Sequence, residues 1–536
     1  MTDATRSGLG PLALILGMFC FGCATAHAQT PLATSPLPAD ARGGEVTLQS
    51  SGTTPGEVSP RTVADALNIA CLLMAGFLVL VLKAGFAMME AGLIRAKNVA
   101  HTVAMNFGVY AIGMLGFWAV GYAVMFGGLP GPLGSMGSAR LLGRTWDLIG
   151  LRGFFLAGGA GDAAILATFF FHAAMLDTAA TIPTGAMAER WKYSAFVAYG
   201  FFASMLIYPV YGCWAWGGGW LADLGVDFGL GNGHVDFAGS SVVHMTGGFM
   251  ALAGALVLGP RIGKYNRNGT ANAIPGHNVP MVAIGTLILA FGWFGLNTGR
   301  AFQAGDGRAA SIAVCTLLAT ASGCLASLAT MWGLFGKPDP TMSCNGLLAG
   351  AVAISAPCAY VNPIGAVVIG ALAGVLVVAS ILFIDKYLRV DDPVGAISVH
   401  GVCGAFGCLG VGLFATGEYG SGTNGVASAP IGFFHGGGFD QLLAQMIGVA
   451  TNILWVFPAS LVGFLAVERL IGNRVSARAE IEGLDVPEMG VLGYVDEDTY
   501  AVQTAGQDFL ATFGPGVPAK GADRSGLGGP KAGGSK

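Results

Sequence analysis

The sequence predicts an all-α polytopic membrane protein. Hydrophobic residues make up 54% of the 536 residues and charged residues only 10%, and the mean hydropathy is +0.65. A soluble domain is about 25% charged, so this chain has too little charge to cover a water-facing surface. The 87 glycines suit close contact between helices in lipid, where small residues let backbones approach. A net charge of −4 argues against a nucleic-acid partner.

Residues 1–28 are predicted to be a cleaved signal peptide. Arg6 supplies the positive start, an apolar run of about a dozen residues follows, and Ala26-His27-Ala28 forms the small-residue exit. A lipoprotein anchored at Cys23 is the alternative, but the motif before that cysteine is poorly formed. Cleavage places the mature N-terminus outside the cell membrane. Residues 29–62 are then predicted to be a disordered extracytoplasmic tail, because they are rich in Ser, Thr, Pro and Gly.

Eleven apolar stretches follow, and each is long enough to cross a hydrocarbon core of about 30 Å. They lie at 65–90, 101–127, 163–188, 193–215, 237–259, 278–300, 309–335, 343–361, 363–384, 393–416 and 440–468. Thirteen Lys and Arg residues fall in the predicted inner loops and five in the outer loops, which fits the positive-inside rule. The sequence therefore predicts a membrane domain at 63–470 in the inner (plasma) membrane. It predicts a cytoplasmic C-terminal tail at 471–536, whose distal part is disordered.

One spacing occurs twice, at the start of the fifth and of the tenth span. His244 follows Asp236 by eight residues, and His400 follows Asp392 by eight residues. Two halves of five spans each must be inverted relative to one another, so the fold is an inverted five-plus-five repeat plus a final helix. Eight helical residues rise about 12 Å, so both histidines are predicted to meet near the midplane from opposite faces. Each Asp is placed to cap the backbone N–H groups of its helix.

The paired histidines favour a pore over two unrelated core histidines, because ionisable residues within a membrane are rare and usually line a pathway. Zinc is another use of paired histidines, but no further ligand has a suitable spacing, so no metal or cofactor is predicted. An inorganic cation would need a ring of oxygens in place of its water. A small weak base fits better, because it can cross as a neutral molecule while the imidazoles relay its proton. Trp216 and Trp293 could attract its cationic form, although tryptophans near an interface are more often membrane anchors.

Several long motifs occur in order along the chain. They are Glu90-Ala-Gly-Leu-Ile-Arg-Ala-Lys-Asn98, Gly185-Ala-Met-Ala-Glu-Arg190, Trp216-Gly-Gly-Gly219, Gly292-Trp-Phe-Gly-Leu-Asn297 and Glu480-Ile-Glu-Gly-Leu-Asp485. In these motifs and in the two Asp–His blocks, the chain resembles the ammonium transporter (Amt/Mep/Rh) family from about residue 65 to residue 494.

The resemblance implies eleven spans, a homotrimer with one pore per subunit, and electrogenic ammonium uptake. It makes His244 and His400 the paired pore histidines and Trp216 the wall of an outer recruitment site. It makes Trp293 a pore-lining residue and Asp236 a supporting carboxylate. It also implies that PII-type signalling proteins dock on the cytoplasmic face.

The chain departs from the family pattern at the pore entrance. Met175 and Leu296 stand where the family has two stacked Phe residues that gate the pore. Arg300 replaces a Ser of the recruitment site, and its fixed charge should repel a cation unless it extends to the outer headgroups. His172 replaces a Gln, and Asp177 adds a carboxylate at membrane depth. We expect Asp177 to pair with Arg300, and His172 and Asp177 to rebuild the polar entrance, because an isolated buried carboxylate is costly.

The leading prediction is therefore an ammonium transporter, and two alternatives stay open. An ammonium sensor of the same fold is favoured by the altered gate residues, but no kinase or cyclase domain is recognised after the last span. A neutral gas channel is disfavoured by the intact Trp216 and histidine pair. An enzyme is disfavoured because no phosphate loop, metal cluster or nucleophile–base pair is found. Lys83, late in the first span, is expected to extend to the inner face.

Overall fold

The computed structural model describes residues 60–128, 136–141, 144–159, 161–301 and 307–494. The chain divides into two units, Met1–Gly493 and Tyr494–Lys536, and the fold described here is that of the first. The predicted signal peptide, nearly all of the predicted N-terminal tail and the distal C-terminal tail lie outside the described residues.

The first half consists of five helical crossings, three of which are joined from α- and π-helical segments. They are α2 (Pro60–Leu93); α3 (Val99–Gly116), η2 (Phe117–Gly121) and α4 (Tyr122–Phe126); α5 (Ala163–Ala186); α6 (Tyr193–Phe202), η4 (Ala203–Ile207) and α7 (Tyr208–Trp216); and η5 (Ser240–Met245) with α9 (Thr246–Leu258). Short helices in the connections are η1 (Ala96–Asn98), η3 (Phe154–Leu156) and α8 (Leu224–Phe228).

The second half repeats this plan and is followed by the last membrane helix and the start of the tail. Its crossings are α10 (Val279–Thr298); α11 (Arg308–Phe335); α12 (Pro340–Ser355); α13 (Pro363–Phe383) with η7 (Ile384–Leu388); and η8 (Ile397–Val402) with α14 (Cys403–Phe414). The final elements are α15 (Asp440–Leu470), α16 (Ala477–Glu482) and η11 (Asp485–Met489), and short turns are η6 (Gly299–Ala301), η9 (Thr423–Gly425) and η10 (Phe433–His435).

Ten helices in the described part of the chain are long and apolar enough to cross a membrane. The eighth predicted window, 343–361, overlaps α12, which has only 16 residues and ends at Ser355. The carbonyls at this helix end bind the segment before η5. The Phe237 N–H donates to the Ala356 carbonyl at 3.3 Å, and the Ala238 N–H donates to the Ser355 carbonyl at 3.0 Å. The predicted membrane fold of eleven helices is thus confirmed, with one helix shortened.

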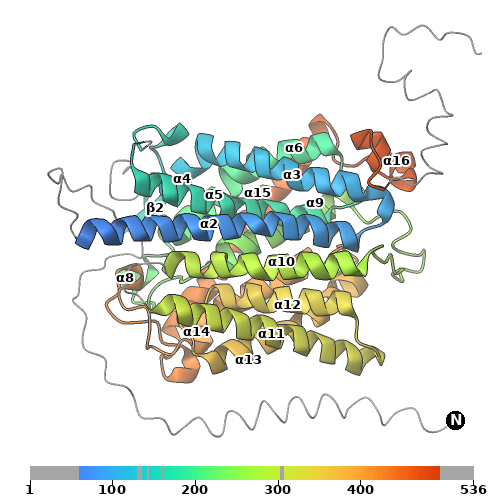
Figure 1. The fold of residues 1–536 in the computed structure, drawn as a ribbon. Helices are drawn as coiled ribbons and strands as arrows, with labels where there is room; N and C mark the ends of the chain where they lie inside the picture. The colour runs from blue at the N-terminus through green and yellow to red at the C-terminus, as the bar shows by residue number, and fades with distance from the viewer. Residues whose placement is uncertain (1–59, 129–135, 142–143, 160, 302–306, 495–536) are drawn as a thin grey trace, which may run out of the picture. The chain divides into compact units, whose positions relative to one another are not determined.

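The two halves begin with helices that lie side by side and run in opposite directions, α2 and α10 (Figure 1). A Cβ on Gly85 would lie 2.7 Å from Leu289, and a Cβ on Gly295 would lie 2.4 Å from Leu78. These glycines therefore let the two helices approach closely, as small residues do in lipid. Because the paired residue numbers rise along α2 and fall along α10, the two halves are inverted relative to one another, as predicted.

A β-hairpin in the loop between α4 and α5 was missed by the all-α prediction. Strands β1 (Met136–Leu141) and β2 (Arg144–Gly150) pair antiparallel. The Trp214 Nε1–H donates to the Leu148 carbonyl at 2.8 Å, and the Trp220 N–H donates to the Asp147 carbonyl at 3.3 Å. Trp214 of α7 and Trp220 beyond it thus bind β2, and strands this short carry little signal of their own in the sequence.

Charged side chains join the loops at the end of the domain that the sequence predicts to be cytoplasmic. Arg261 lies 3.2 Å from Glu189 and 2.8 Å from Asp391, and Arg95 also pairs with Glu189. Burial alone would raise the pKa of Asp391, but hydrogen bonds from Arg261 and the charge of Arg190 outweigh it and lower this pKa to about 2. The Asp391 carboxyl is therefore ionised near neutral pH, and its ion pairs hold the loops together.

The first part of the C-terminal tail packs on these loops. Arg474 pairs with Glu480 at 2.8 Å, and the same carboxylate accepts a hydrogen bond from the Ile262 N–H at 2.7 Å. Asp485 accepts a hydrogen bond from the His101 N–H at 2.9 Å. The Glu480–Asp485 motif therefore ties the tail to the membrane domain through specific polar contacts.

Candidate functional site

His244 and His400 lie in two π-helical segments that open the fifth and the tenth crossing, η5 and η8. In η5 the His244 N–H donates to the carbonyl of Gly239, five residues earlier, at 2.9 Å. In η8 the Cys403 N–H donates to the carbonyl of Ser398, also five residues earlier. Such π-bulges inside helices are frequent at functional sites.

The structure brings the two imidazoles into direct contact. The Nδ1 atoms of His244 and His400 are 3.2 Å apart, and their ring centroids are 5.2 Å apart at an interplanar angle of 25°. Both side chains are buried. A hydrogen bond between two Nδ1 atoms needs one donor and one acceptor, so the two rings share a single proton at this contact.

Trp293 stacks against His244. Its indole lies 5.0 Å from the His244 ring at an angle of 18°, and its Nε1–H donates to the Ser355 hydroxyl at 3.1 Å. The Nε2 atom of His244 has no hydrogen-bond partner among the described residues. An aromatic ring therefore fixes one face of the His244 imidazole, and its Nε2 atom is available to bind another molecule.

The two halves cross at a pair of glycines just beyond the histidines. A Cβ on Gly248 would lie 2.2 Å from the Gly401 nitrogen and 2.5 Å from its Cα. A Cβ on Gly401 would lie no closer than 3.6 Å to any neighbouring atom. The backbone contact at Gly248 therefore sets the distance between the two histidine-bearing helices.

The two predicted capping carboxylates lie at the starts of these segments. Asp236 accepts hydrogen bonds from four backbone N–H groups, those of Gly239, Ser240, Ser241 and Val242, at 2.7–2.9 Å. Asp392 accepts hydrogen bonds from the N–H groups of Gly395 and Ile397 at 3.0 and 2.7 Å. Each carboxylate thereby satisfies N–H groups that the helix start leaves unpaired and fixes the segment that carries its histidine.

An aromatic cluster lies near the start of η5. The Trp216 Nε1–H donates to the Asp236 carbonyl at 2.6 Å, and the His172 ring lies 5.6 Å from Trp216 and 4.5 Å from Phe126. The Arg300 guanidinium lies over the Trp216 ring, with its Cζ 4.9 Å from the ring centroid. Arg300 therefore neither points to the headgroups nor stands apart from the aromatic face, but covers that face with its own cation.

The expected pairing of Asp177 with Arg300 is wrong. Asp177 pairs instead with Lys83 across the α2–α5 contact at 2.8 Å, and Lys83 also donates to the Thr181 hydroxyl. The expectation that Lys83 extends to the inner face is wrong for the same reason. A buried lysine and a buried carboxylate on facing helices each cost less when paired than when left alone.

The two residues at the predicted gate, Met175 and Leu296, are both fully buried in the same apolar core. Aliphatic side chains thus fill this part of the core.

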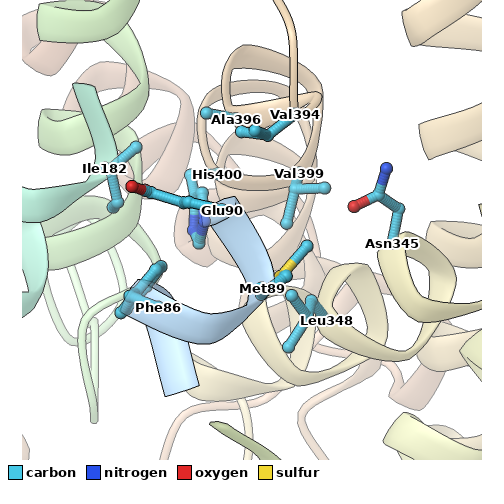
Figure 2. A pocket seen from close by; sticks show the side chains of 10 residues that line it. All are labelled: Phe86, Met89, Glu90, Ile182, Asn345, Leu348, Val394, Ala396, Val399 and His400. Carbon is cyan, nitrogen blue, oxygen red and sulfur yellow. The ribbon is translucent and has the colours of Figure 1, made fainter. Parts of the chain in front are cut away.

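The sequence analysis missed a pocket. It lies on the side of the histidine pair that is away from the aromatic cluster. It is lined by Phe86, Met89, Glu90, Ile182, Asn345, Leu348, Val394, Ala396, Val399 and His400 (Figure 2). Gly299, next to Arg300, packs against Ala75 of α2, and Glu90 lies fifteen residues further along the same helix. Fifteen helical residues at about 1.5 Å each span about 22 Å. The pocket therefore lies about this far along α2 from the aromatic cluster.

Among the described residues, no group of three or more His, Cys, Asp or Glu side chains could hold a metal ion. The arrangement is a line of three features: an aromatic cluster, a histidine pair and a pocket. It can attract a cation, exchange a proton and hold a small polar molecule.

Comparison with known proteins identifies the family of the chain. Residues 70–494 match the model of the Ammonium Transporter Family. The chain is 43% identical over 428 residues to ammonium transporter Amt2 of Archaeoglobus fulgidus, which covers 79% of this chain and 87% of that protein. The chain belongs to the ammonium transporter family. It is also 36% identical over 457 residues to ammonium transporter Amt1 of Haloferax mediterranei, covering 82% of this chain and 81% of that protein.

Among solved structures, the chain is similar to one named Sensor Amt Protein. The two share 34% identity with a TM-score of 0.69, over 80% of this chain and 99% of the other. The named relatives among the sequences are ammonium transporters, and neither is named as an enzyme. Membership in the ammonium transporter family and a multi-pass membrane fold are thus established for this chain.

Proposed function

We propose that this member of the ammonium transporter family recruits ammonium at Trp216 and conducts ammonia, with a relayed proton, past His244 and His400. The observation that carries the proposal is the 3.2 Å contact between the two Nδ1 atoms in a buried site. A neutral imidazole both donates and accepts a hydrogen bond, so a proton that enters one ring can leave from the other. The apolar surroundings disfavour passage of a bare charge.

The other predicted site residues support this route in distinct ways. Trp216 offers the aromatic face for the cation, and Trp293 holds the His244 ring in place. Asp236 positions both features, because its carbonyl binds Trp216 and its carboxylate caps η5. Met175 and Leu296 would keep water out of the path, since both are buried aliphatic side chains.

The setting of the protein is part of the proposal. The N-terminus would lie outside the inner membrane and the C-terminus in the cytoplasm, as the distribution of Lys and Arg supports. A homotrimer, and a PII-type protein at the cytoplasmic face, are supported by the family resemblance.

The test is an ammonium-evoked current from purified protein in proteoliposomes on a solid-supported membrane. A saturable current is expected in the wild type, and it should fall strongly in His244→Ala and His400→Ala. His435→Ala, in an exposed loop, is the matched control and should keep the current. A wild-type current that survives both pore substitutions would refute the role of the histidine pair.

Two observations favour a second function, an ammonium sensor that binds its ligand but conducts little. Arg300 already covers the Trp216 face, and a solved structure that is 34% identical is named Sensor Amt Protein. A folded wild-type protein that binds ammonium and gives no current would support the sensor.

A further inference from the structure

His234 is a buried histidine that the proposed conduction path does not use. It lies in the connection between α8 and η5, two residues before Asp236, and its side chain is fully buried. Its backbone N–H donates to the Leu221 carbonyl at 2.9 Å, and its carbonyl accepts a hydrogen bond from the Asn424 amide at 3.2 Å. The main chain thus fixes the place of the ring, whose two nitrogens have different surroundings.

The Nε2 atom of His234 lies between two hydroxyl groups. It is 3.0 Å from the Ser241 hydroxyl of η5 and 3.2 Å from the Tyr211 hydroxyl of α7. The Ser241 hydroxyl donates to the Asp236 carboxylate at 2.7 Å, and the Tyr211 hydroxyl donates to the Gly448 carbonyl at 3.2 Å. Because a hydroxyl has only one hydrogen, both oxygens are left as acceptors toward Nε2. These contacts therefore require His234 to carry its proton on Nε2.

The Nδ1 atom of His234 faces the backbone of α15. A Cβ on Gly448 would lie 2.0 Å from this atom, which has no hydrogen-bond partner among the described residues. Burial also lowers the pKa of His234, although the charge of Asp236 opposes this shift. A second proton would find no acceptor at Nδ1, so the ring is the neutral tautomer with its proton on Nε2.

A directed chain of hydrogen bonds leads from His234 to the aromatic face of Trp216. The His234 Nε2–H donates to the Ser241 hydroxyl, which donates to Oδ2 of Asp236. The same Oδ2 accepts the Ser241 backbone N–H at 2.7 Å. The Asp236 carbonyl in turn accepts the Trp216 indole N–H at 2.6 Å. Asp236 thus couples the neutral histidine to the orientation of the indole.

We propose that His234 is a positioning residue for ammonium recruitment, acting through Ser241 and Asp236 on the indole of Trp216. The inference rests on the proposed function for the role of Trp216. With the His234 N–H in place, the Ser241 hydroxyl can point only toward Asp236, which keeps the carboxylate and the indole in one arrangement. Without this N–H the hydroxyl is free to turn, and ammonium should bind more weakly to a less ordered aromatic face.

The first experiment replaces the ring with amides of two lengths. The amide nitrogen of His234→Gln can take the place of Nε2, whereas that of His234→Asn reaches only the place of Nδ1, against Gly448. Binding is measured as the ammonium-dependent rise in melting temperature of the purified protein, with equal concentrations of sodium chloride as the reference.

The two amides should differ in their effect on half-saturation by ammonium. His234→Gln should stay within about 2-fold of the wild type, whereas His234→Asn and His234→Leu should raise half-saturation by about 5-fold, the equivalent of one lost hydrogen bond. His435→Gln, in an exposed loop, is the matched control and should behave as the wild type.

The second experiment determines the tautomer and needs no ammonium. Solid-state NMR is recorded on the full-length protein in lipid with nitrogen-15 in its histidine rings. The difference between the wild-type and His234→Gln spectra should contain a neutral imidazole without a proton on Nδ1. A difference spectrum that shows a proton on Nδ1 at neutral pH overturns the chain of hydrogen bonds.

The outcomes separate the role of His234 from conduction. Equal half-saturation in His234→Gln, His234→Asn and His234→Leu overturns the positioning role, even where the current depends on the histidine pair. A half-saturation that His234→Gln preserves and His234→Asn does not, in a protein without current, supports the positioning role and refutes conduction. If His234→Leu does not fold, the comparison of His234→Gln with His234→Asn decides the question.

Discussion

Replacing Arg300 with Gln is expected to lower the ammonium concentration that gives a half-maximal current. The Arg300 guanidinium lies 4.9 Å from the centroid of the Trp216 ring, on the face proposed to recruit the substrate. A contact of this kind is worth about 0.5–1 kcal/mol when exposed and about 2 kcal/mol when desolvated. Ammonium must displace this tethered cation, so its removal should lower the half-saturation concentration between about 2-fold and about 30-fold.

The assay is the concentration dependence of the current on a solid-supported membrane, with Arg300→Lys as the control. A lysine keeps a positive charge near the ring, so its half-saturation should stay close to that of the wild type. If Arg300→Gln and the wild type have the same half-saturation, Arg300 does not compete with the substrate and the reasoning is refuted. A higher half-saturation in Arg300→Gln would show that the guanidinium assists binding.

Three further predictions concern the framework of the site. Asp177→Asn should lower the free energy of unfolding by about 3–5 kcal/mol, because it leaves Lys83 buried without its carboxylate partner. The double variant Lys83→Met/Asp177→Leu should recover most of this loss. Thermal unfolding in detergent measures both, and equal melting temperatures for the wild type and Asp177→Asn would contradict the prediction. Gly248→Ala should lower the free energy of unfolding by about 1–3 kcal/mol and reduce the current, because backbone atoms of Gly401 must move. Gly401→Ala should keep the current. Similar currents in the two variants would argue against a helix crossing set by Gly248. The pKa of Asp391, lowered from the ordinary 3.8 to about 2, should contribute about 2 kcal/mol to the free energy of unfolding, which is fully present above pH 4 and is lost as the pH falls to 2. An acid-unfolding curve that is the same for Asp391→Asn would count against it.

The sequence contains enough to predict the histidine pair because the relevant spacing is local. Eight residues separate each Asp from its His, and two halves with an odd number of spans must be inverted. These two facts place both imidazoles at similar depth without any knowledge of side-chain contacts. The structure adds the π-helical backbone and the distance between the rings.

Other contacts depend on which faces of two helices meet, and a linear pattern does not record this. Lys83 and Asp177 are far apart in the sequence. The depth of Asp177 in the membrane could therefore be estimated, but it did not distinguish Lys83 from Arg300 as the partner. The pocket at Glu90 and Asn345 is built from residues of several separate elements, each of which is an ordinary helix or loop in the sequence. Glu90 did stand at the start of a recognised motif, and that was the available signal.

The π-helical segments have a consequence for how this protein tolerates changes of length. A π turn holds one residue more than the α turn that it replaces. Deleting one residue of η5 before His244 would restore a plain α-helix and turn His244 and α9 by about 100° relative to the Asp236 cap. The Asp236 cap and the contacts of His244 and Gly248 with η8 could then no longer form together. The same holds for η8, so the meeting of the two halves depends on one additional residue in each. Single-residue deletions at these two places should therefore harm the protein more than most substitutions of the residues around them.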